Sequence, residues 1–211
     1  MDDDTAAVGI LGDLRLAAVV LAAGAGRRFG GHKLEAELHG RPLLQHVLDT
    51  LQQVRPVMTM VVMGPDMGLV ERITWHGEQR VVNQDPTRGL SSSVRRGIDV
   101  CAADERLDGA FILLGDQPLT AASTLVTLSA AAPRAINDGA LAVLPSYEDG
   151  GGANPVLLLR AGFPLVALVA GDHGLGSVLA ERPDQLCRVP IPGKNPDVDT
   201  VADLRAIESG P

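Results

Sequence analysis

Short runs of aliphatic residues alternate along the chain with longer segments in which hydrophobic positions recur every three or four residues. The short runs have the length and the β-branched content of buried strands, whereas the longer segments have the period of amphipathic helices. This alternation is typical of an α/β fold in which parallel strands are joined by right-handed crossovers. The predicted strands are residues 16–22, 58–63, 79–83, 109–114 and 140–144.

Four helices are expected between these strands. Pro42 stands at a first-turn position, where its missing N–H costs nothing, and the serines at 91–93 and Thr120 are expected to cap two later helices. The pattern predicts a Rossmann-like, doubly wound, mostly parallel sheet with helices on both faces and a ligand site at the carboxyl ends of its strands. The predicted helices are residues 42–53, a short one near 66–73, 91–103 and 120–131.

After residue 145 the rhythm changes. A glycine-rich turn at 149–152 and an extended segment at 153–160 predict an antiparallel strand that adds the far wall of the ligand cleft. Because no linker interrupts the chain, we expect a single domain over 14–211 behind a flexible leader at 1–13. Three further helices are expected near 162–169, near 174–181 and after Asp199.

Composition narrows the class of protein. The 211 residues are 45% hydrophobic and 21% charged, which is typical of a soluble globular protein. A net charge of -8 and only 2% aromatic residues argue against nucleic acid as a partner. No run approaches 18 apolar residues, so no membrane partner is expected, and the acidic start differs from a secretory signal. Two distant cysteines without zinc-site spacing fit a reducing compartment, and we expect a cytoplasmic protein.

The stretch VVLAAGAGRRFGGHKL, residues 19–34, is the first candidate site. Its glycines permit close backbone approach, so that consecutive N–H groups can form an anion-binding nest beside Arg28 and Lys33. This combination indicates a polyphosphate ligand. Leu34 stands where a P-loop needs Ser or Thr, so the Walker A pattern is excluded. The glycines are Gly24, Gly26, Gly30 and Gly31, and Arg27 adds a further cation.

Two alternatives for this loop remain open. The spacing G-x-G-x-x-x-G is a loose variant of a dinucleotide fingerprint, which would suit an NAD(P)H-dependent oxidoreductase. The other alternative is a plain turn between a strand and a helix, which would need fewer glycines and no cluster of cations.

Carboxylates follow at two places. Asp116 ends a predicted central strand in FILLGDQPLT, and Asp197 and Asp199 stand two apart in NPDVDTVADL. Carboxylate oxygens are the ligands that Mg²⁺ prefers, so Asp116 and Asp199 are candidate metal ligands. The alternatives are that Asp116 forms a turn and that Asp199 or Thr200 caps the last helix.

Together these motifs resemble the MobA-like nucleotidyltransferases, in particular their molybdenum-cofactor cytidylyltransferase branch. The matching stretches occur in family order from end to end: LAAGAGRRFGGHKL, GLSSSVRRG, LLGDQPL, GGANPVLL, GDHGLGSVL and DVDTVADL. Ala23 in LAAG resembles the cytidine-using branch, because the guanylyl-using relatives show LAGG. The turn at 149–152 lacks the Arg or Lys that the family often carries there.

The resemblance implies a Mg²⁺-dependent enzyme that transfers CMP from CTP to a molybdopterin-type acceptor and releases pyrophosphate, with a molybdoenzyme as a possible client. A guanylyltransferase and a non-catalytic carrier of the cofactor remain alternatives. Arg28, Lys33 and Asp116 would be catalytic, Asp116 and Asp199 would hold the metal, and Ser92 would help to hold the nucleotide or cap a helix. The implied nucleotide-binding residues are Leu21, Ala22, Ala23, Gly24, Gly26, Lys33, Ser92 and Asp116, and the implied acceptor-binding residues are Asn154, Asp172 and His173.

Overall fold

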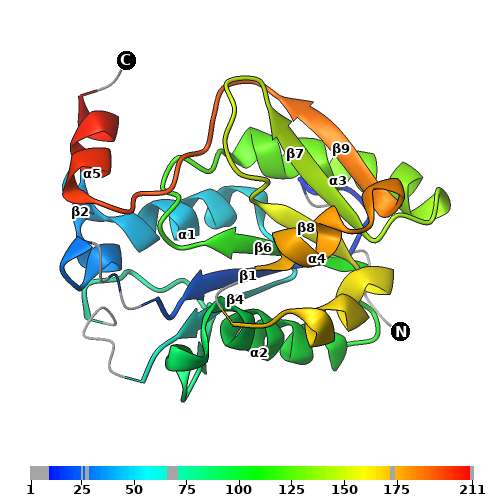
Figure 1. The fold of residues 1–211 in the computed structure, drawn as a ribbon, viewed down its shortest axis with the longest axis horizontal. Coiled ribbons are helices and arrows are strands. Elements are labelled where there is room, and N and C mark those ends of the chain that lie inside the picture. The colour runs from blue at the N-terminus through cyan, green and yellow to red at the C-terminus, as the bar shows by residue number, and fades with distance from the viewer. Residues whose placement is uncertain (1–9, 25, 27–28, 66–70, 172–173, 210–211) are drawn as a thin grey trace, which may run out of the picture.

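A seven-stranded sheet forms the centre of the protein (Figure 1). The computed structural model describes residues 10–24, 26, 29–65, 71–171 and 174–209. The strand order is β5-β4-β1-β6-β8-β7-β9. Among the described strands of this sheet, only β8 runs antiparallel to its neighbours. The predicted α/β class and mostly parallel sheet are therefore confirmed. The strands are β1 (Leu16–Ala22), β4 (Met58–Met63), β5 (Gln79–Val82), β6 (Gly109–Leu114), β7 (Ala142–Tyr147), β8 (Val156–Leu159) and β9 (Leu186–Ile191).

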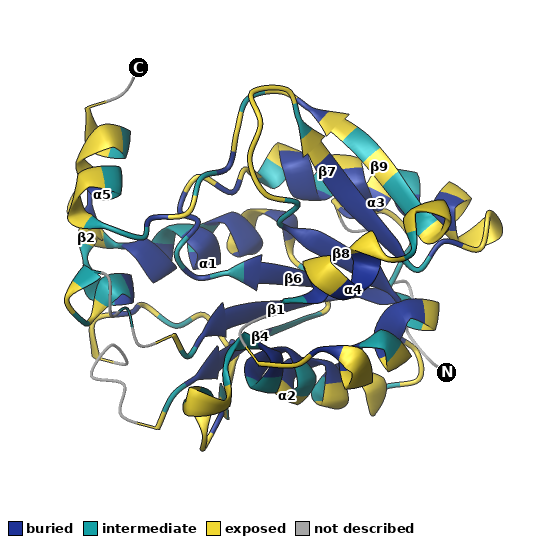
Figure 2. Cartoon of the chain, in the orientation of Figure 1, coloured by how far each residue is buried: buried dark blue, intermediate teal, exposed yellow. Residues whose placement is uncertain are grey.

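Helices cover both faces of the sheet and bury it (Figure 2). Successive residues of β1 point to opposite faces, so Val20 packs in the layer of α1 and α3, whereas Val19 packs in the layer of α2, η5 and α4. This burial on both sides explains why the strand is apolar at every position. The α-helices are α1 (Leu43–Val54), α2 (Leu90–Ala102), α3 (Ala122–Asn137), α4 (Leu175–Ala180) and α5 (Val201–Glu208), and the 3-10 helices are η2 (Lys33–Glu35), η4 (Pro86–Arg88), η5 (Arg160–Leu168) and η6 (Pro183–Gln185).

The structure corrects several sequence predictions of local detail. Helix α2 begins after Gly89 and α3 after Ala121, and neither has a side-chain cap, so the predicted caps are wrong. The Thr120 hydroxyl instead donates to the Gln117 carbonyl oxygen at 2.9 Å, and the Ser92 hydroxyl donates to Gly89 in the same way at 2.8 Å. Strand β9 and the hairpin of β2 (Glu37–Leu38) and β3 (Arg41–Pro42) were not predicted. Most of the helix predicted near 66–73 lies outside the described residues.

The chain direction places a switch point between β1 and β6. Strand β1 pairs with β4 on one side and with β6 on the other, so the two crossovers leave in opposite directions. Leu21 and Leu114 are paired in register, which brings the loops that follow β1 and β6 to the same edge of the sheet. Ligands bind at such points in doubly wound sheets.

Part of the segment before β1 belongs to the core. Leu11, within the range predicted as a leader, is buried in the core layer of α1 and α3. The division into a leader and a single domain stays a prediction.

Among the described residues, no helix combines the length and the apolar character needed to cross a membrane.

Candidate active site

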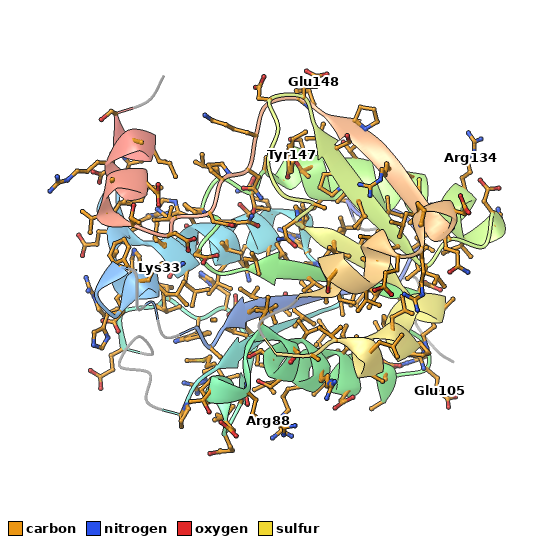
Figure 3. All side chains as sticks on the ribbon, in the orientation of Figure 1. Lys33, Arg88, Glu105, Arg134, Tyr147 and Glu148 are labelled. Carbon is orange, nitrogen blue, oxygen red and sulfur yellow. The ribbon has the colours of Figure 1, made fainter. Side chains whose placement is uncertain are left out.

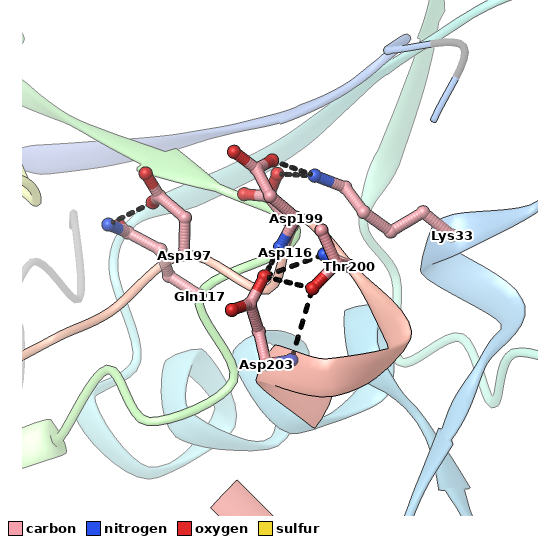
Figure 4. A network of polar contacts seen from close by, with 7 residues as sticks. All are labelled: Lys33, Asp116, Gln117, Asp197, Asp199, Thr200 and Asp203. Carbon is pink, nitrogen blue, oxygen red and sulfur yellow. Dashed lines mark hydrogen bonds and ion pairs between the residues drawn. The ribbon is translucent and has the colours of Figure 1, made fainter. Parts of the chain in front are cut away.

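A lysine held between two carboxylates marks the carboxyl edge of the sheet (Figure 4). Lys33 Nζ lies 2.5 Å from Asp116 Oδ2 and 2.9 Å from Asp199 Oδ1, although 166 positions separate Lys33 from Asp199 in the chain. The lysine side chain is 12% exposed, and those of the two aspartates are 21% and 44% exposed. Burial alone would lower the pKa of the Lys33 ammonium, but hydrogen bonds and charge from Asp116 and Asp199 outweigh it and raise the pKa. The structure thus brings together three of the predicted site residues.

Backbone hydrogen bonds fix the two aspartates. Gly115 N donates to Leu21 O at 3.0 Å, which ties the Asp116 loop to the end of β1, and Val198 N donates to Asp116 O at 3.0 Å, which docks the tail on that loop. Thr200 is the N-cap of α5 in a capping box with Asp203. The predicted cap is therefore confirmed at Thr200, and Asp199 is left to pair with Lys33.

Amide side chains extend this network behind Asp116. Gln117 Nε2 donates to Asp197 Oδ1 at 2.7 Å and to Asn195 O at 3.3 Å, and Asn195 Nδ2 donates to Thr120 Oγ1 at 3.2 Å. Loss of hydration, followed by the negative charge of Asp116, raises the pKa of Asp197. A third carboxylate therefore lies close enough to Asp116 to feel its charge.

Two observations indicate that Asp116 and Asp199 fit a divalent cation. Both carboxylates already converge on one positive group, the Lys33 ammonium, and Asp116 Oδ1 is buried without a hydrogen-bond partner. Buried polar atoms are normally paired, so a carboxylate oxygen in this state is a candidate ligand. Over the part of the chain that the structure describes, no group of three or more His, Cys, Asp or Glu is arranged to hold a metal ion. The case for a metal rests on this pair.

The glycine loop folds back on Lys33. A Cβ built on Gly26, whose φ is +58°, would lie 2.9 Å from Lys33 Cβ and 3.2 Å from Lys33 N, so this position requires glycine. The N–H groups of Phe29 and Gly31 both donate to Gly26 O, at 2.9 and 3.1 Å, and these two therefore do not form the predicted anion nest. Arg28, predicted to be catalytic, lies outside the described residues, as does Arg27.

The predicted nucleotide-binding residues at the end of β1 become more exposed along the chain. Leu21 and Ala22 are buried, Ala23 is partly exposed and Gly24 is exposed. The last residues of the strand therefore reach the surface beside the Asp116 loop, and their predicted contact with a nucleotide stays a prediction.

A pocket of about 330 Å³ opens beside these loops and is lined mainly by apolar side chains. Leu21 from β1, Leu114 from β6 and the predicted acceptor residue Asn154 all line it, together with Ser177 of α4. The Asn154 carbonyl accepts a hydrogen bond from the Tyr147 hydroxyl at 3.0 Å, which holds the segment before β8. The other two predicted acceptor residues, Asp172 and His173, lie outside the described residues.

Ser92 is not brought into this pocket. It lines a separate groove of about 790 Å³ on the outer side of α2, and its hydroxyl also accepts a hydrogen bond from Asn83 Nδ2 at 2.8 Å. Arg95 lines the same groove, but its guanidinium donates to the carbonyls of Val166, Ala167 and Val169 at the end of η5. Arg95 therefore ties α2 to the end of η5.

Comparison with known proteins assigns the family. The model of the MobA-like NTP transferase domain matches residues 18–186, which include the glycine loop, Asp116 and the pocket. The chain belongs to this family. A curated relative of this MobA-like protein, the bifunctional protein GlmU of Desulfitobacterium hafniense, is 33% identical over 176 residues. That alignment covers 82% of this chain but 32% of GlmU, so the chain spans about a third of the length of such relatives.

Solved structures agree with the assignment. Rv0371c from Mycobacterium tuberculosis H37Rv superposes on the MobA-like chain with a TM-score of 0.81 and 26% identity, over 93% of this chain and 98% of that one. Its homologue from Mycobacterium sp. strain JC1 gives a TM-score of 0.80 and 28% identity, over 92% and 96%. A complex of Rv0371c with manganese superposes with a TM-score of 0.78 and 25% identity, over 93% and 99%.

Sequence reasoning missed the amide frame of the site in this MobA-like protein. Gln117 follows the candidate metal ligand directly, and Asn195 precedes the tail aspartates by two and four positions. Both are 2% exposed, but nothing in an isolated amide residue tells which distant partner it will meet. Their position inside the two acidic motifs was the available signal.

Proposed function

We propose that the protein is a divalent-metal-dependent nucleotidyltransferase that transfers CMP from CTP to a molybdopterin-type acceptor and releases pyrophosphate. The observation that carries the proposal is the convergence of Lys33, Asp116 and Asp199 at the switch point of the sheet. Family membership supports the reaction class.

Nucleotidyl transfer requires little covalent chemistry from the protein itself. An oxygen of the acceptor phosphate attacks the α-phosphorus, the bond from the α-phosphorus to its bridging oxygen breaks, and pyrophosphate leaves with the electron pair. The protein must hold the two substrates in line and neutralise the charge that develops. Lys33 supplies a positive charge beside the glycine loop, and the same role is proposed for Arg28.

Asp116 and Asp199 would hold the metal, which we propose is Mg²⁺. When bound, such an ion neutralises triphosphate charge and orients the phosphate oxygens. Two carboxylates suffice for a Mg²⁺ site that is completed by water and phosphate oxygens. The manganese in the Rv0371c complex supports a divalent ion in this fold.

The choice of base is proposed from the end of β1. Ala23 gives the stretch LAAG that resembles the cytidine-using branch, and it directly follows the buried Ala22 beside the Asp116 loop. We expect higher kcat/KM for CTP than for GTP, and a shift toward GTP in Ala23→Gly. An equal preference in the wild-type protein would instead support the guanylyltransferase alternative.

The acceptor is proposed from the apolar pocket. A volume of about 330 Å³ lies within the range of small-molecule sites, and its walls are mainly aliphatic, with Asn154 and Ser177 as polar groups. Such a lining favours a flat ring system over a sugar, whose many hydroxyl groups would be left without partners. A molybdopterin-type acceptor meets this requirement. Asn154, Asp172 and His173 are proposed to contact it.

The direct test is turnover. Purified protein is incubated with CTP, GTP or ATP, Mg²⁺ or Mn²⁺ and molybdopterin-type cofactor, and both pyrophosphate and the dinucleotide product are measured. Asp116→Asn should reduce turnover by at least about 100-fold, which is the size of loss seen when one charge-stabilising group is removed. No pyrophosphate with any triphosphate, or full activity in Asp116→Asn, would overturn the proposal.

A matched control removes the same charge at the far side of the molecule. Asp138→Asn changes a 66% exposed aspartate that pairs with Arg134. Figure 3 shows Arg134 at the side of the molecule opposite Lys33. This variant should keep wild-type turnover.

Ligand-induced stabilisation separates the remaining alternatives. A ligand that binds the native state raises the melting temperature by linkage. A Mg²⁺-dependent rise with CTP above GTP, ATP and NADPH is expected. A metal-independent rise with NADPH alone would favour the oxidoreductase alternative, and tight cofactor binding without turnover would favour a carrier that serves a client enzyme.

A further inference from the structure

The Lys33 ammonium cannot pair with Asp116 and Asp199, as it does in the structure, and contact the triphosphate, as proposed above, at the same time. The ammonium lies 2.5 Å and 2.9 Å from the oxygens of Asp116 and Asp199, between the two carboxylates that would hold the metal. Any cation bound by both oxygens needs the space that Nζ fills. The same ammonium is also the group proposed to contact the triphosphate.

We propose that Lys33 and the divalent metal exchange at this carboxylate pair, so that metal entry releases Lys33 to the triphosphate. The inference rests on the proposed function for the identity of the site. Two carboxylates and one ammonium carry a net charge of -1. Adding a divalent ion with the ammonium in place would set two cations side by side, and moving the ammonium to the triphosphate removes that repulsion.

The local structure permits this exchange. The Lys33 backbone is held because it packs against Gly26, at the first residue of η2, whereas its four-carbon side chain is flexible. The side chain therefore pivots from a fixed point beneath the glycine loop. Asp116 and Asp199 are fixed in turn by the Val198 hydrogen bond and the α5 capping box, so the pair stays assembled when the ammonium leaves.

The consequence is that the free protein weakens its own metal site. The metal must displace an ion pair with two partners, whereas in the presence of triphosphate the displaced ammonium gains a new anionic partner. Metal and nucleotide therefore bind with positive coupling, and reciprocity requires that each strengthen the other equally.

The first experiment measures Mn²⁺ binding to the nucleotide-free protein by electron paramagnetic resonance. Lys33→Met should bind Mn²⁺ more tightly than the wild-type protein, by about 5- to 150-fold, the usual range of coupling between sites. The chain has one other lysine, Lys194, which is exposed. Lys194→Met changes the net charge identically and should bind Mn²⁺ as the wild-type protein does. Equal, weaker or undetectable Mn²⁺ binding in Lys33→Met would overturn the inference.

The second experiment uses the wild-type protein, in case Lys33→Met does not fold. The two lysines are acylated with limiting acetic anhydride and quantified by peptide mass spectrometry. Mn²⁺ should speed the modification of Lys33 at least several-fold and leave Lys194 unchanged, and further addition of CTP should protect Lys33. Unchanged or slower Lys33 modification with Mn²⁺ would contradict the exchange.

Failure of the inference and failure of the proposed function are distinguishable. Neither experiment requires turnover, so tighter Mn²⁺ binding in Lys33→Met can hold in a protein that transfers no nucleotide. Conversely, CMP transfer by the wild-type protein without tighter Mn²⁺ binding in Lys33→Met would retain the enzyme and remove the exchange.

Discussion

The contact between α2 and the sheet at Gly97 can be tested by adding a single methyl group. A Cβ built on this glycine would lie 2.3 Å from Cγ1 of Val19 on β1 and 3.3 Å from Cγ2 of Val62 on β4. Gly97, Val19 and Val62 are all buried, and the branched Cβ of valine restricts its side-chain rotation, so neither valine can move away cheaply. Gly97→Ala should therefore force α2 away from β1, the strand that precedes the glycine loop.

Two opposing magnitudes decide the sign. Alanine in place of glycine within a helix stabilises by about 1 kcal/mol. Overpacking a filled core costs about 1–3 kcal/mol, and a contact of 2.3 Å lies far inside van der Waals distance, so the upper part of that range applies. The net expectation is a loss of roughly 1–2 kcal/mol, which for a chain of this size lowers the melting temperature by about 2–8 °C.

Gly176 provides the matched control. It lies in α4, and a Cβ built there would meet no atom within 4 Å. Gly176→Ala should stabilise the protein by about 0.5–1 kcal/mol, because it reduces the entropy of the unfolded chain without a clash. Urea unfolding followed by circular dichroism measures both variants. If Gly97→Ala were as stable as Gly176→Ala, α2 would not be packed tightly on β1 and the reasoning would be refuted.

Two further predictions concern the tail and the thiols. Thr200→Ala removes the α5 cap and should cost about 1 kcal/mol in urea unfolding and weaken Mn²⁺ binding at the adjacent Asp199, whereas Thr127→Ala, an exposed site within α3, should do neither; equal losses in both variants would contradict this. Cys101 is fully buried, and burial raises the pKa of its thiol to about 12, so Ellman's reagent should modify Cys187 first and Cys101 only after unfolding; equal rates in the native protein would contradict it.

The sequence predicted the buried strands well because burial on both faces makes them apolar throughout. Strand β9, LCRVPI, was not predicted because it lies at the edge of the sheet, mixes exposed and buried positions and contains a proline. The hairpin of β2 and β3 was not predicted because each strand has two residues, too few to show an alternation of apolar and polar positions. Periodicity thus recovers the elements that the core dictates and loses some of those at its margin, although the edge strand β5 was predicted.

The candidate site was predictable as separate motifs but not as an assembly. G-D-Q-P and D-V-D-T each indicated a carboxylate, and the glycine loop indicated a cation beside phosphate. Their meeting depends on contacts between segments about 80 positions apart along the chain, such as the hydrogen bonds from Val198 N to Asp116 O and from Gln117 Nε2 to Asp197 Oδ1. Thr200 rather than Asp199 caps α5, and the Asp199 carboxylate pairs with Lys33 instead. The stretch TVAD, residues 200–203, has the pattern of a capping box, so this choice could have been predicted from the sequence.

The distribution of unpaired polar atoms argues that this assembly is maintained for a ligand. Four buried side-chain polar atoms lack a hydrogen-bond partner in the part of the chain that the structure describes, and three belong to neighbouring residues of the site: Asp116 Oδ1, Gln117 Oε1 and Asn195 Oδ1. Each such atom costs about 1–3 kcal/mol of stability. The fourth is Arg15 Nε, so three of the four unpaired atoms lie beside one lysine–carboxylate cluster, and the fold loses stability at that place. A bound cation at Asp116 offsets part of that cost. Metal and nucleotide should therefore stabilise the native protein chiefly through this cluster, and Asp116→Asn should abolish that stabilisation.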